Sequence, residues 1–197
     1  NENYVHSALP EGARDGILRG LYRLHAAGDP EQAARVQLLG AGALLRETLA
    51  ASALLDQDWG VAADVWSVTS FTELRRDGLN AERHNRSHPD AQPTLSWVEQ
   101  CLTPTTGPIV AVSDYLRAVP DLIRTWVPRG YVTLGTDGFG RSDTRAALRR
   151  FFEVDRHYIA IAALKALADE GVIDRAQVQQ AMVRYGIDPD QPNPWER

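Results

Sequence analysis

Several residue types and patterns are scarce in this chain of 197 residues, and each scarcity removes a class of protein. The single cysteine, Cys101, permits no internal disulfide bond and no zinc site built on several cysteines, so a reducing compartment is expected. No apolar run approaches the ~20 residues that a membrane-spanning helix needs. Basic residues do not cluster, and the formal net charge of −5 speaks against nucleic acid as a partner.

The sequence motifs of common catalytic sites are also missing. The chain contains no G-x-S-x-G nucleophile elbow, no P-loop and no H-E-x-x-H zinc motif. Only His84 and His88 have the spacing of two metal ligands on one helical turn. No Glu lies between them and a zinc site needs a third protein ligand, so we interpret them as solvated surface histidines. The isolated chain is therefore expected to be inactive.

The start of the chain gives a further expectation. The first residue is Asn1 and the only methionine is Met182, which does not resemble a translation start or a targeting peptide. We therefore expect a piece of a longer protein. Residues 1–19 are expected to form a lead-in linker and a short helix, residues 20–188 one domain, and residues 189–197, with three prolines, an extended tail.

Short apolar segments alternate with helical patterns, which predicts an α/β fold. The five expected strands are residues 20–25, 35–39, 62–68, 109–112 and 131–134. The connection between the first two has no room for a crossover helix. That pair is therefore expected to be antiparallel and the remaining strands parallel.

Two helices carry predictions about their ends and faces. Ser70 and Glu73 have the spacing of a capping box, and Asp77-Gly78 is expected to end the helix that Ser70 begins. In the helix after the second strand, Leu45, Leu49 and Ala53 are expected to form the main apolar stripe, with Leu44, Ala51 and Leu55 beside it.

The segment that opens this second helix, 40–45, is close to the dinucleotide fingerprint G-x-G-x-x-G. Leu45 stands at the third glycine position, where the helix should approach the strand closely. No acidic residue closes the next strand, where a ribose partner would be expected. The residues therefore disfavour a nucleotide site at this turn.

A glycine-rich turn after the fifth expected strand is the candidate site. It consists of Asp137, Gly138, Phe139, Gly140, Arg141, Ser142 and Asp143. Ser142 is expected to cap the following helix, whose first N–H groups could hold an anion. The negative charges of Asp137 and Asp143 argue against a phosphate there. A tight turn that packs a helix onto the sheet is the favoured interpretation.

Two residues of this turn allow opposite interpretations. Phe139 lies between two glycines and is either an exposed contact residue or an anchor in the core. Arg141 either reaches a carboxylate of a partner or folds back on Asp137 or Asp143. Our hypothesis is that the turn contacts another part of a larger protein.

Three stretches of the sequence resemble a known family. They are residues 64–74, 76–78 and 134–143, and the last contains the specific run from Asp137 to Asp143. Together they resemble the carboxyl-terminal domain of the homodimeric pyruvate dehydrogenase first component, the thiamine-dependent, decarboxylating subunit. The resemblance covers essentially the whole chain, since residues 1–4, 10–12, 36–40, 186–188 and 193–194 also resemble the family. It implies a transketolase carboxyl-terminal-domain fold with three layers (α/β/α) and a five-stranded mixed sheet with one antiparallel strand.

The resemblance also implies what the parent oxidoreductase does. It would decarboxylate pyruvate with thiamine diphosphate and magnesium, which bind between two upstream domains, and acetylate the lipoyl group of the second component. No position here matches the catalytic histidines or glutamate of those domains, so no catalytic, cofactor-binding or metal-binding residue is expected in this chain. The expected partners are the upstream domains, the dimer mate and the dihydrolipoyl acetyltransferase component, in the bacterial cytoplasm and without nucleic acid or membrane.

Two other classes of function remain open. One is a free-standing nucleotide-binding or regulatory α/β domain that uses residues 40–43 or 138–142, and stabilisation by a nucleotide would favour it. The other is a pure protein-interaction module, which a partner footprint without chemistry would reveal. The favoured hypothesis is a domain that supports the dimer of the parent enzyme.

Overall fold

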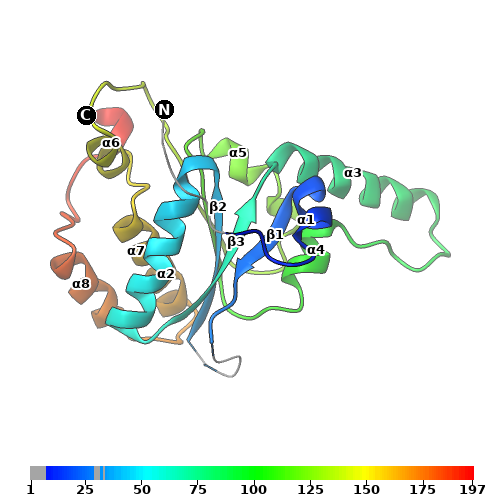
Figure 1. Cartoon of the computed structure of the whole chain (residues 1–197), viewed down its shortest axis with the longest axis horizontal. Coiled ribbons are helices and arrows are strands. Elements are labelled where there is room, and N and C mark those ends of the chain that lie inside the picture. Colours follow the sequence, from blue (N-terminus) through cyan, green and yellow to red (C-terminus); the bar gives the residue numbers. More distant parts are fainter. Residues whose placement is uncertain (1–7, 29–31, 33) are drawn as a thin grey trace.

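The computed structural model describes residues 8–28, 32 and 34–197, and its centre is one five-stranded sheet (Figure 1). The strand order is β1-β3-β2-β4-β5. The strands are β1 (Leu21–His25), β2 (Arg35–Ala41), β3 (Ala62–Val68), β4 (Ile109–Val112) and β5 (Tyr131–Leu134). β2 to β5 are mutually parallel, and β1 runs antiparallel to β3. The predicted mixed sheet with one antiparallel strand is confirmed.

The predicted pairing of the first two strands is wrong. β1 and β2 do run in opposite directions, as their short connection requires, but β3 lies between them. Leu21 at the start of β1 stands opposite Val68 at the end of β3. The start of β1 therefore lies at the same edge of the sheet as the carboxyl ends of the four parallel strands.

Helices cover both faces of the sheet and give the expected three layers (Figure 1). One face packs against α2 (Leu45–Trp59) and α7 (Arg156–Asp169), and α8 (Arg175–Arg184) packs on α7. The other face packs against α3 (Phe71–Ser87) and α4 (Trp97–Leu102). The remaining helices are α1 (Ala13–Arg19), α5 (Ala118–Asp121), α6 (Arg145–Phe151) and the 3-10 turns η1 (Gly42–Leu44), η2 (Arg124–Trp126) and η3 (Pro194–Glu196).

Alternation along β2 separates the two cores. Val36 and Leu38 point to the α2 and α7 side, whereas Leu39 and Ala41 point to the α3 and α4 side. All four are buried, because helices cover the parallel strands from both sides. The apolar strand segments in the sequence thus indicate a sheet whose central strands are buried on both faces.

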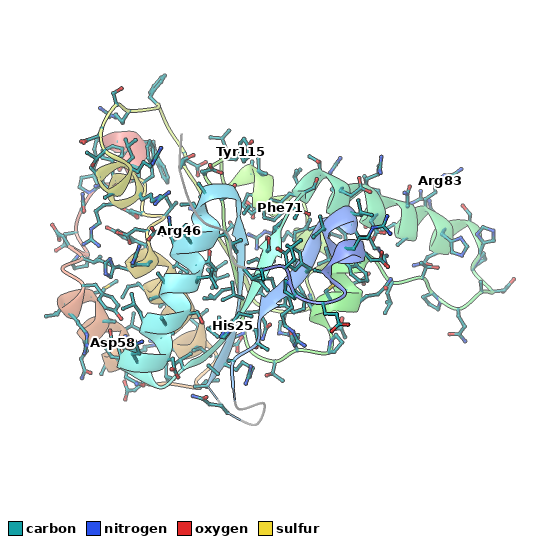
Figure 2. All side chains as sticks on the ribbon, in the orientation of Figure 1. His25, Arg46, Asp58, Phe71, Arg83 and Tyr115 are labelled. Carbon is teal, nitrogen blue, oxygen red and sulfur yellow. The ribbon has the colours of Figure 1, made fainter. Side chains whose placement is uncertain are left out.

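Helix α3 is longer than its sequence indicates. Ser70 caps it, since its hydroxyl accepts a hydrogen bond from the Glu73 backbone N–H at 3.1 Å, but the helix continues past Asp77-Gly78 to Ser87. The expected stop at Gly78 is wrong. This glycine lies inside the helix and gives room to Trp126, because a Cβ there would lie 2.4 Å from ring atoms of Trp126. The outer half of α3, which carries Arg83, projects beyond the sheet (Figures 1 and 2).

The buried face of α2 also differs from the prediction. Leu45, Leu49 and Ala53 are not buried, and the core side consists of Glu47, Thr48, Ala51, Ser52 and Leu55. The prediction followed the apolar residues, whereas three residues of the buried face are polar and hydrogen-bonded: Glu47 to Arg156, Thr48 to the Leu44 carbonyl and Ser52 to the Ala63 carbonyl. The helix start also passes close to the end of β2, since a Cβ on Gly40 would lie 2.5 Å from the Thr48 hydroxyl.

Candidate functional site

The glycine-rich turn leaves the carboxyl end of β5, and its first residues are fixed against the loop that follows β4. The Thr136 backbone N–H donates to the Tyr115 carbonyl at 2.9 Å, and the Thr136 hydroxyl donates to the Asp114 carbonyl at 2.7 Å. The Asp137 carboxylate accepts a hydrogen bond from the Arg117 backbone N–H at 3.1 Å. The base of the turn is therefore rigid, and both carboxyl-terminal loops form one unit.

Gly138 is required for two separate reasons. Its φ of 100° lies in the left-handed region, which favours glycine. A Cβ on Gly138 would also lie 3.1 Å from the Cβ of Trp195, so the tail of the chain packs directly on this residue. Gly140, in contrast, has open space around it.

The structure decides between the two interpretations of Phe139 and of Arg141. Phe139 is 89% exposed, so it is not a core anchor. Arg141 does not pair with Asp137 or Asp143 in the part of the chain that the structure describes. Its guanidinium donates to the Arg197 carbonyl and lies 5.0 Å from the centre of the Phe151 ring. The turn thus presents an aromatic side chain to solvent and uses its arginine to hold the tail.

The start of α6 lies two residues later than predicted. Ser142 does not cap the helix; Thr144 does, because its hydroxyl accepts a hydrogen bond from the Ala147 backbone N–H at 3.3 Å. Thr144 has the extended backbone of an N-cap residue, and the Asp143 carboxylate accepts from the Thr144 N–H at 2.6 Å. The candidate residues from Asp137 to Asp143 therefore all belong to the turn.

The tail is not fully extended, contrary to the prediction. Pro194–Glu196 form a 3-10 turn, and the Arg197 guanidinium donates to the Glu153 carboxylate at 2.6 Å. Arg197 lies 5.1 Å from the Phe151 ring centre, so Phe151 has contacts with both Arg197 and Arg141. Burial raises the pKa of Glu153, although the charge of Arg197 opposes this effect.

Glu153 has an unusual backbone. Its φ of 58° makes it the only residue other than glycine with positive φ among the residues described. Such a conformation costs on the order of 1 kcal/mol and persists where surrounding contacts hold it. The contact with Arg197 is one such restraint, so the tail and the strained residue depend on each other.

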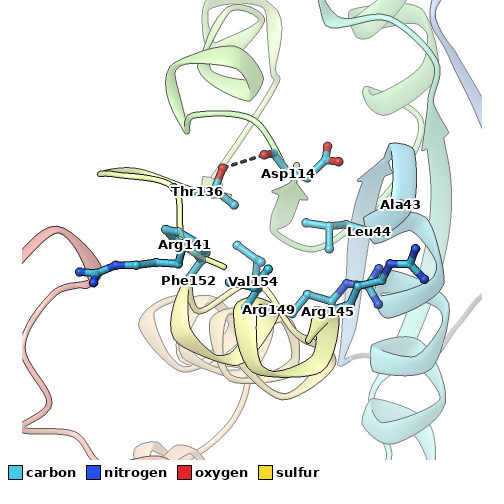
Figure 3. A pocket seen from close by; sticks show the side chains of 11 residues that line it. Ala43, Leu44, Asp114, Thr136, Arg141, Arg145, Arg149, Phe152 and Val154 are labelled. Atoms are coloured by element: carbon cyan, nitrogen blue, oxygen red, sulfur yellow. Dashed lines mark hydrogen bonds between the residues drawn. The ribbon is translucent and has the colours of Figure 1, made fainter. Parts of the chain in front are cut away.

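A cavity of about 470 Å³ lies beside the turn, at the carboxyl ends of β2 and β4, where the strand order reverses (Figure 3). Its lining is Ala43, Leu44, Asp114, Thr136, Gly140, Arg141, Arg145, Leu148, Arg149, Phe152 and Val154. Both glycine turns of the sequence therefore reach one cavity. The guanidinium of Arg141 points away from it, whereas Arg145 and Arg149 extend toward the start of α2 (Figure 3).

A buried carboxylate anchors the helix that follows the turn, and the sequence patterns did not reveal it. Glu47 on α2 is 5% exposed and accepts hydrogen bonds from Arg149 on α6 at 3.2 Å and from the Arg156 side chain at 2.9 Å. Burial alone would raise the pKa of Glu47, but the hydrogen bonds and charges of Arg156 and Arg149 lower it overall. The available signal was its spacing from Ala51 and Leu55 on the buried face.

Neither a cluster of metal ligands nor a reactive cysteine is present among the described residues. They contain no group of three or more His, Cys, Asp or Glu that could hold a metal ion. The rings of His84 and His88 stack with centres 4.4 Å apart. Burial raises the pKa of the Cys101 thiol to about 11, which makes it a poor nucleophile at neutral pH. None of the described helices has the length and apolarity to cross a membrane.

The architecture is that of an open α/β domain whose candidate surface lies at the carboxyl edge of its sheet. The family described as Transketolase-like TK C-terminal domain matches residues 20–155, and the chain belongs to this family. Solved structures agree with the fold. A transketolase from Pichia stipitis in complex with a sugar phosphate has a TM-score of 0.53 at 18% identity, over 83% of this chain and 20% of the transketolase. One from Leishmania mexicana has a TM-score of 0.51 at 15% identity, over 79% and 19%.

Sequence relatives are more specific. The chain is 55% identical over 196 residues to a pyruvate dehydrogenase E1 component from Pseudomonas aeruginosa, covering 98% of this chain and 22% of the relative. It is 46% identical to the E1 component of Escherichia coli strain K12, over 98% and 22%, and 47% identical to that of Mycobacterium tuberculosis, over 95% and 20%. The chain thus spans about a fifth of the length of these relatives.

Proposed function

We propose that this chain is the carboxyl-terminal domain of a pyruvate dehydrogenase that transfers acetyl groups. The observation that carries the proposal is the 55% identity over 98% of the chain to a relative of that name. The parent enzyme decarboxylates pyruvate with thiamine diphosphate and acetylates the lipoyl group of the dihydrolipoyl acetyltransferase component. It works as a homodimer in the bacterial cytoplasm, within the multienzyme complex.

Thiamine diphosphate and magnesium belong to the upstream domains of the parent. A diphosphate-bound Mg²⁺ needs oxygen ligands in octahedral geometry, including carboxylates. In the candidate turn, the carboxylates of Asp137 and Asp143 instead accept hydrogen bonds from the backbone N–H groups of Arg117 and Thr144. In this proposal, the contribution of this chain to catalysis is indirect.

That contribution is a contact between the turn 137–143 and the upstream domains, which supports the dimer and the geometry of its active site. An 89% exposed Phe139 on a rigid base fits an interface, because aromatic residues are enriched in protein contacts. The base is held by hydrogen bonds from Thr136 and to Asp137, so little conformational entropy is lost when it binds.

Replacement of Phe139 by Ala in the full-length enzyme tests this proposal. Acetyl-transferring activity should fall several-fold, whereas the melting temperature of the 197-residue chain should change by no more than about 1 °C, since an exposed side chain adds little to folding. Val183→Ala is the matched control, because Val183 is 83% exposed on α8. Unchanged activity, or a strongly destabilised 197-residue chain, would refute the contact.

A nucleotide-binding or regulatory role is the second candidate. The observation that favours it is the meeting of both glycine turns at one cavity where the strand order reverses, a common position for ligands in open α/β sheets. Its volume of about 470 Å³ lies in the range of small-molecule sites. A rise in melting temperature with millimolar ADP, lost in Arg145→Gln and kept in Arg175→Gln, would support this role.

A further inference from the structure

Four large apolar side chains are exposed around the turn, on three separate segments. Phe139 is 89%, Tyr115 67%, Leu116 53% and Trp195 50% exposed. The segments touch one another, since Thr136 bonds to the Tyr115 carbonyl and Trp195 packs on Gly138. Figure 2 places Tyr115 at the edge of the sheet where the carboxyl-terminal loops gather. A clustered set of exposed aromatics marks an interaction site more strongly than scattered ones.

The tail is the element that holds this surface together. Trp195 covers Gly138 on one side of the turn, and the Arg197 carbonyl accepts a hydrogen bond from Arg141 on the other. The Arg197 side chain is bound in turn by Glu153 and lies over Phe151. The tail therefore bridges the turn and the residues that follow α6, and it restrains the backbone on both sides of Phe139.

We propose that residues 193–197 act as a strap that fixes the turn, and that Trp195, Tyr115 and Leu116 form one contact surface with Phe139. The occupant is the upstream part of the parent polypeptide, so this inference rests on the proposed function. The relatives carry about four-fifths of their length outside the matched region. Arg117 and Asp137 line a small hollow together with Trp195, so polar groups accompany the apolar side chains, as in protein interfaces.

Hydroxyl-radical footprinting tests the extent of the surface, because aromatic side chains oxidise readily when exposed. The oxidation rates of Tyr115, Phe139 and Trp195 are compared between the 197-residue chain and the full-length enzyme. All three should oxidise about fivefold or more slowly in the enzyme, as expected for residues buried at a contact.

The outcomes separate this inference from the proposed function. Slow oxidation of Phe139 alone would leave the turn contact standing and refute the larger surface. Equal rates for all three residues would refute both. Protection that grows with the concentration of the 197-residue chain alone would assign the surface to a second copy and overturn the choice of occupant.

Limited trypsin digestion of the 197-residue chain tests the strap. Cleavage after Arg141 requires its guanidinium to leave the Arg197 carbonyl and Phe151 and to enter the protease. Trp195→Ala should therefore speed cleavage at this bond about fivefold or more, since proteolysis follows the population of the open form. Gln191→Ala is the control, because Gln191 is an exposed tail residue outside the strap. A rate for Trp195→Ala equal to that of the control would overturn the strap.

Discussion

Replacement of Glu47 by Gln should weaken the fold where the turn and its helix join the body of the domain. Glu47 accepts hydrogen bonds from Arg149 and Arg156, and its side chain is 7% exposed. The variant leaves two arginines near a neutral amide. Loss of one partner from a buried ion pair costs about 3–5 kcal/mol. The Arg156 side chain is 45% exposed and regains hydration, so we expect a smaller loss of about 2–3 kcal/mol.

Urea denaturation of the 197-residue chain measures this loss. The matched control is Glu73→Gln, which removes the same charge from a pair with Arg76 at the surface, 2.7 Å apart. The Arg76 side chain is 71% exposed, so the control should lose no more than about 0.5 kcal/mol. If Glu47→Gln lost no more than this control, Glu47 would not anchor α6 and α7.

The pH dependence of the same measurement gives an independent check. Because the pKa of Glu47 is lowered in the folded chain from its ordinary 4.5, its stabilisation is complete above about pH 4.5 and is lost as the pH falls through the folded pKa. Glu47→Gln has no such titration. The difference in unfolding free energy between the wild-type chain and the variant should therefore shrink at acid pH. A difference that stays constant from neutral pH to acid pH would contradict the assignment.

Three further predictions concern stability and cofactor binding. Ser70→Ala should lower the unfolding free energy by about 1 kcal/mol, because the Glu73 backbone N–H loses the hydroxyl that accepts its hydrogen bond. An unchanged urea midpoint would show that Ser70 does not cap α3. Gly78→Ala should destabilise by about 1–3 kcal/mol despite the better helix propensity of Ala, because its methyl group would overlap Trp126; equal or higher stability would contradict this packing. Calorimetry of the 197-residue chain with thiamine diphosphate and Mg²⁺ should show no saturable binding, and micromolar affinity would refute the placement of the cofactor in the upstream domains.

Much of the fold was predictable because its strands are apolar and its turns contain glycine. The order of the strands in the sheet was not predictable. The short connection after β1 sets the direction of β2 but not which strand lies beside it. That place is decided by the crossover through α2, which inserts β3 between them. The sequence predicts a helix end at Gly78, because it does not show that Trp126 lies against this glycine.

At the candidate site, the sequence located the turn but not its contacts. The two glycines and the aromatic residue between them marked the segment, and the exposure of Phe139 agrees with one of its two interpretations. The role of Arg141 depends on the Arg197 carbonyl, which lies 56 residues away in the chain. The buried position of Glu47 was unpredictable for the same reason, since its partners Arg149 and Arg156 follow it by more than 100 residues.

The antiparallel direction of β1 has a consequence for how the domain is tethered. Because Leu21 stands opposite the end of β3, the chain passes from α1 into the sheet at the edge that carries the turn, and this entry into β1 is the attachment point of the sheet. β1 and β5 are the two outer strands, so this attachment point and the turn are separated by four strand spacings, about 19 Å. Polypeptide that precedes α1 reaches this point through a helix of seven residues, about 10 Å long, so the contact surface stays at a high effective concentration near it. A parallel first strand would place the attachment point at the opposite edge, one strand length away, so the same contact would need a longer tether.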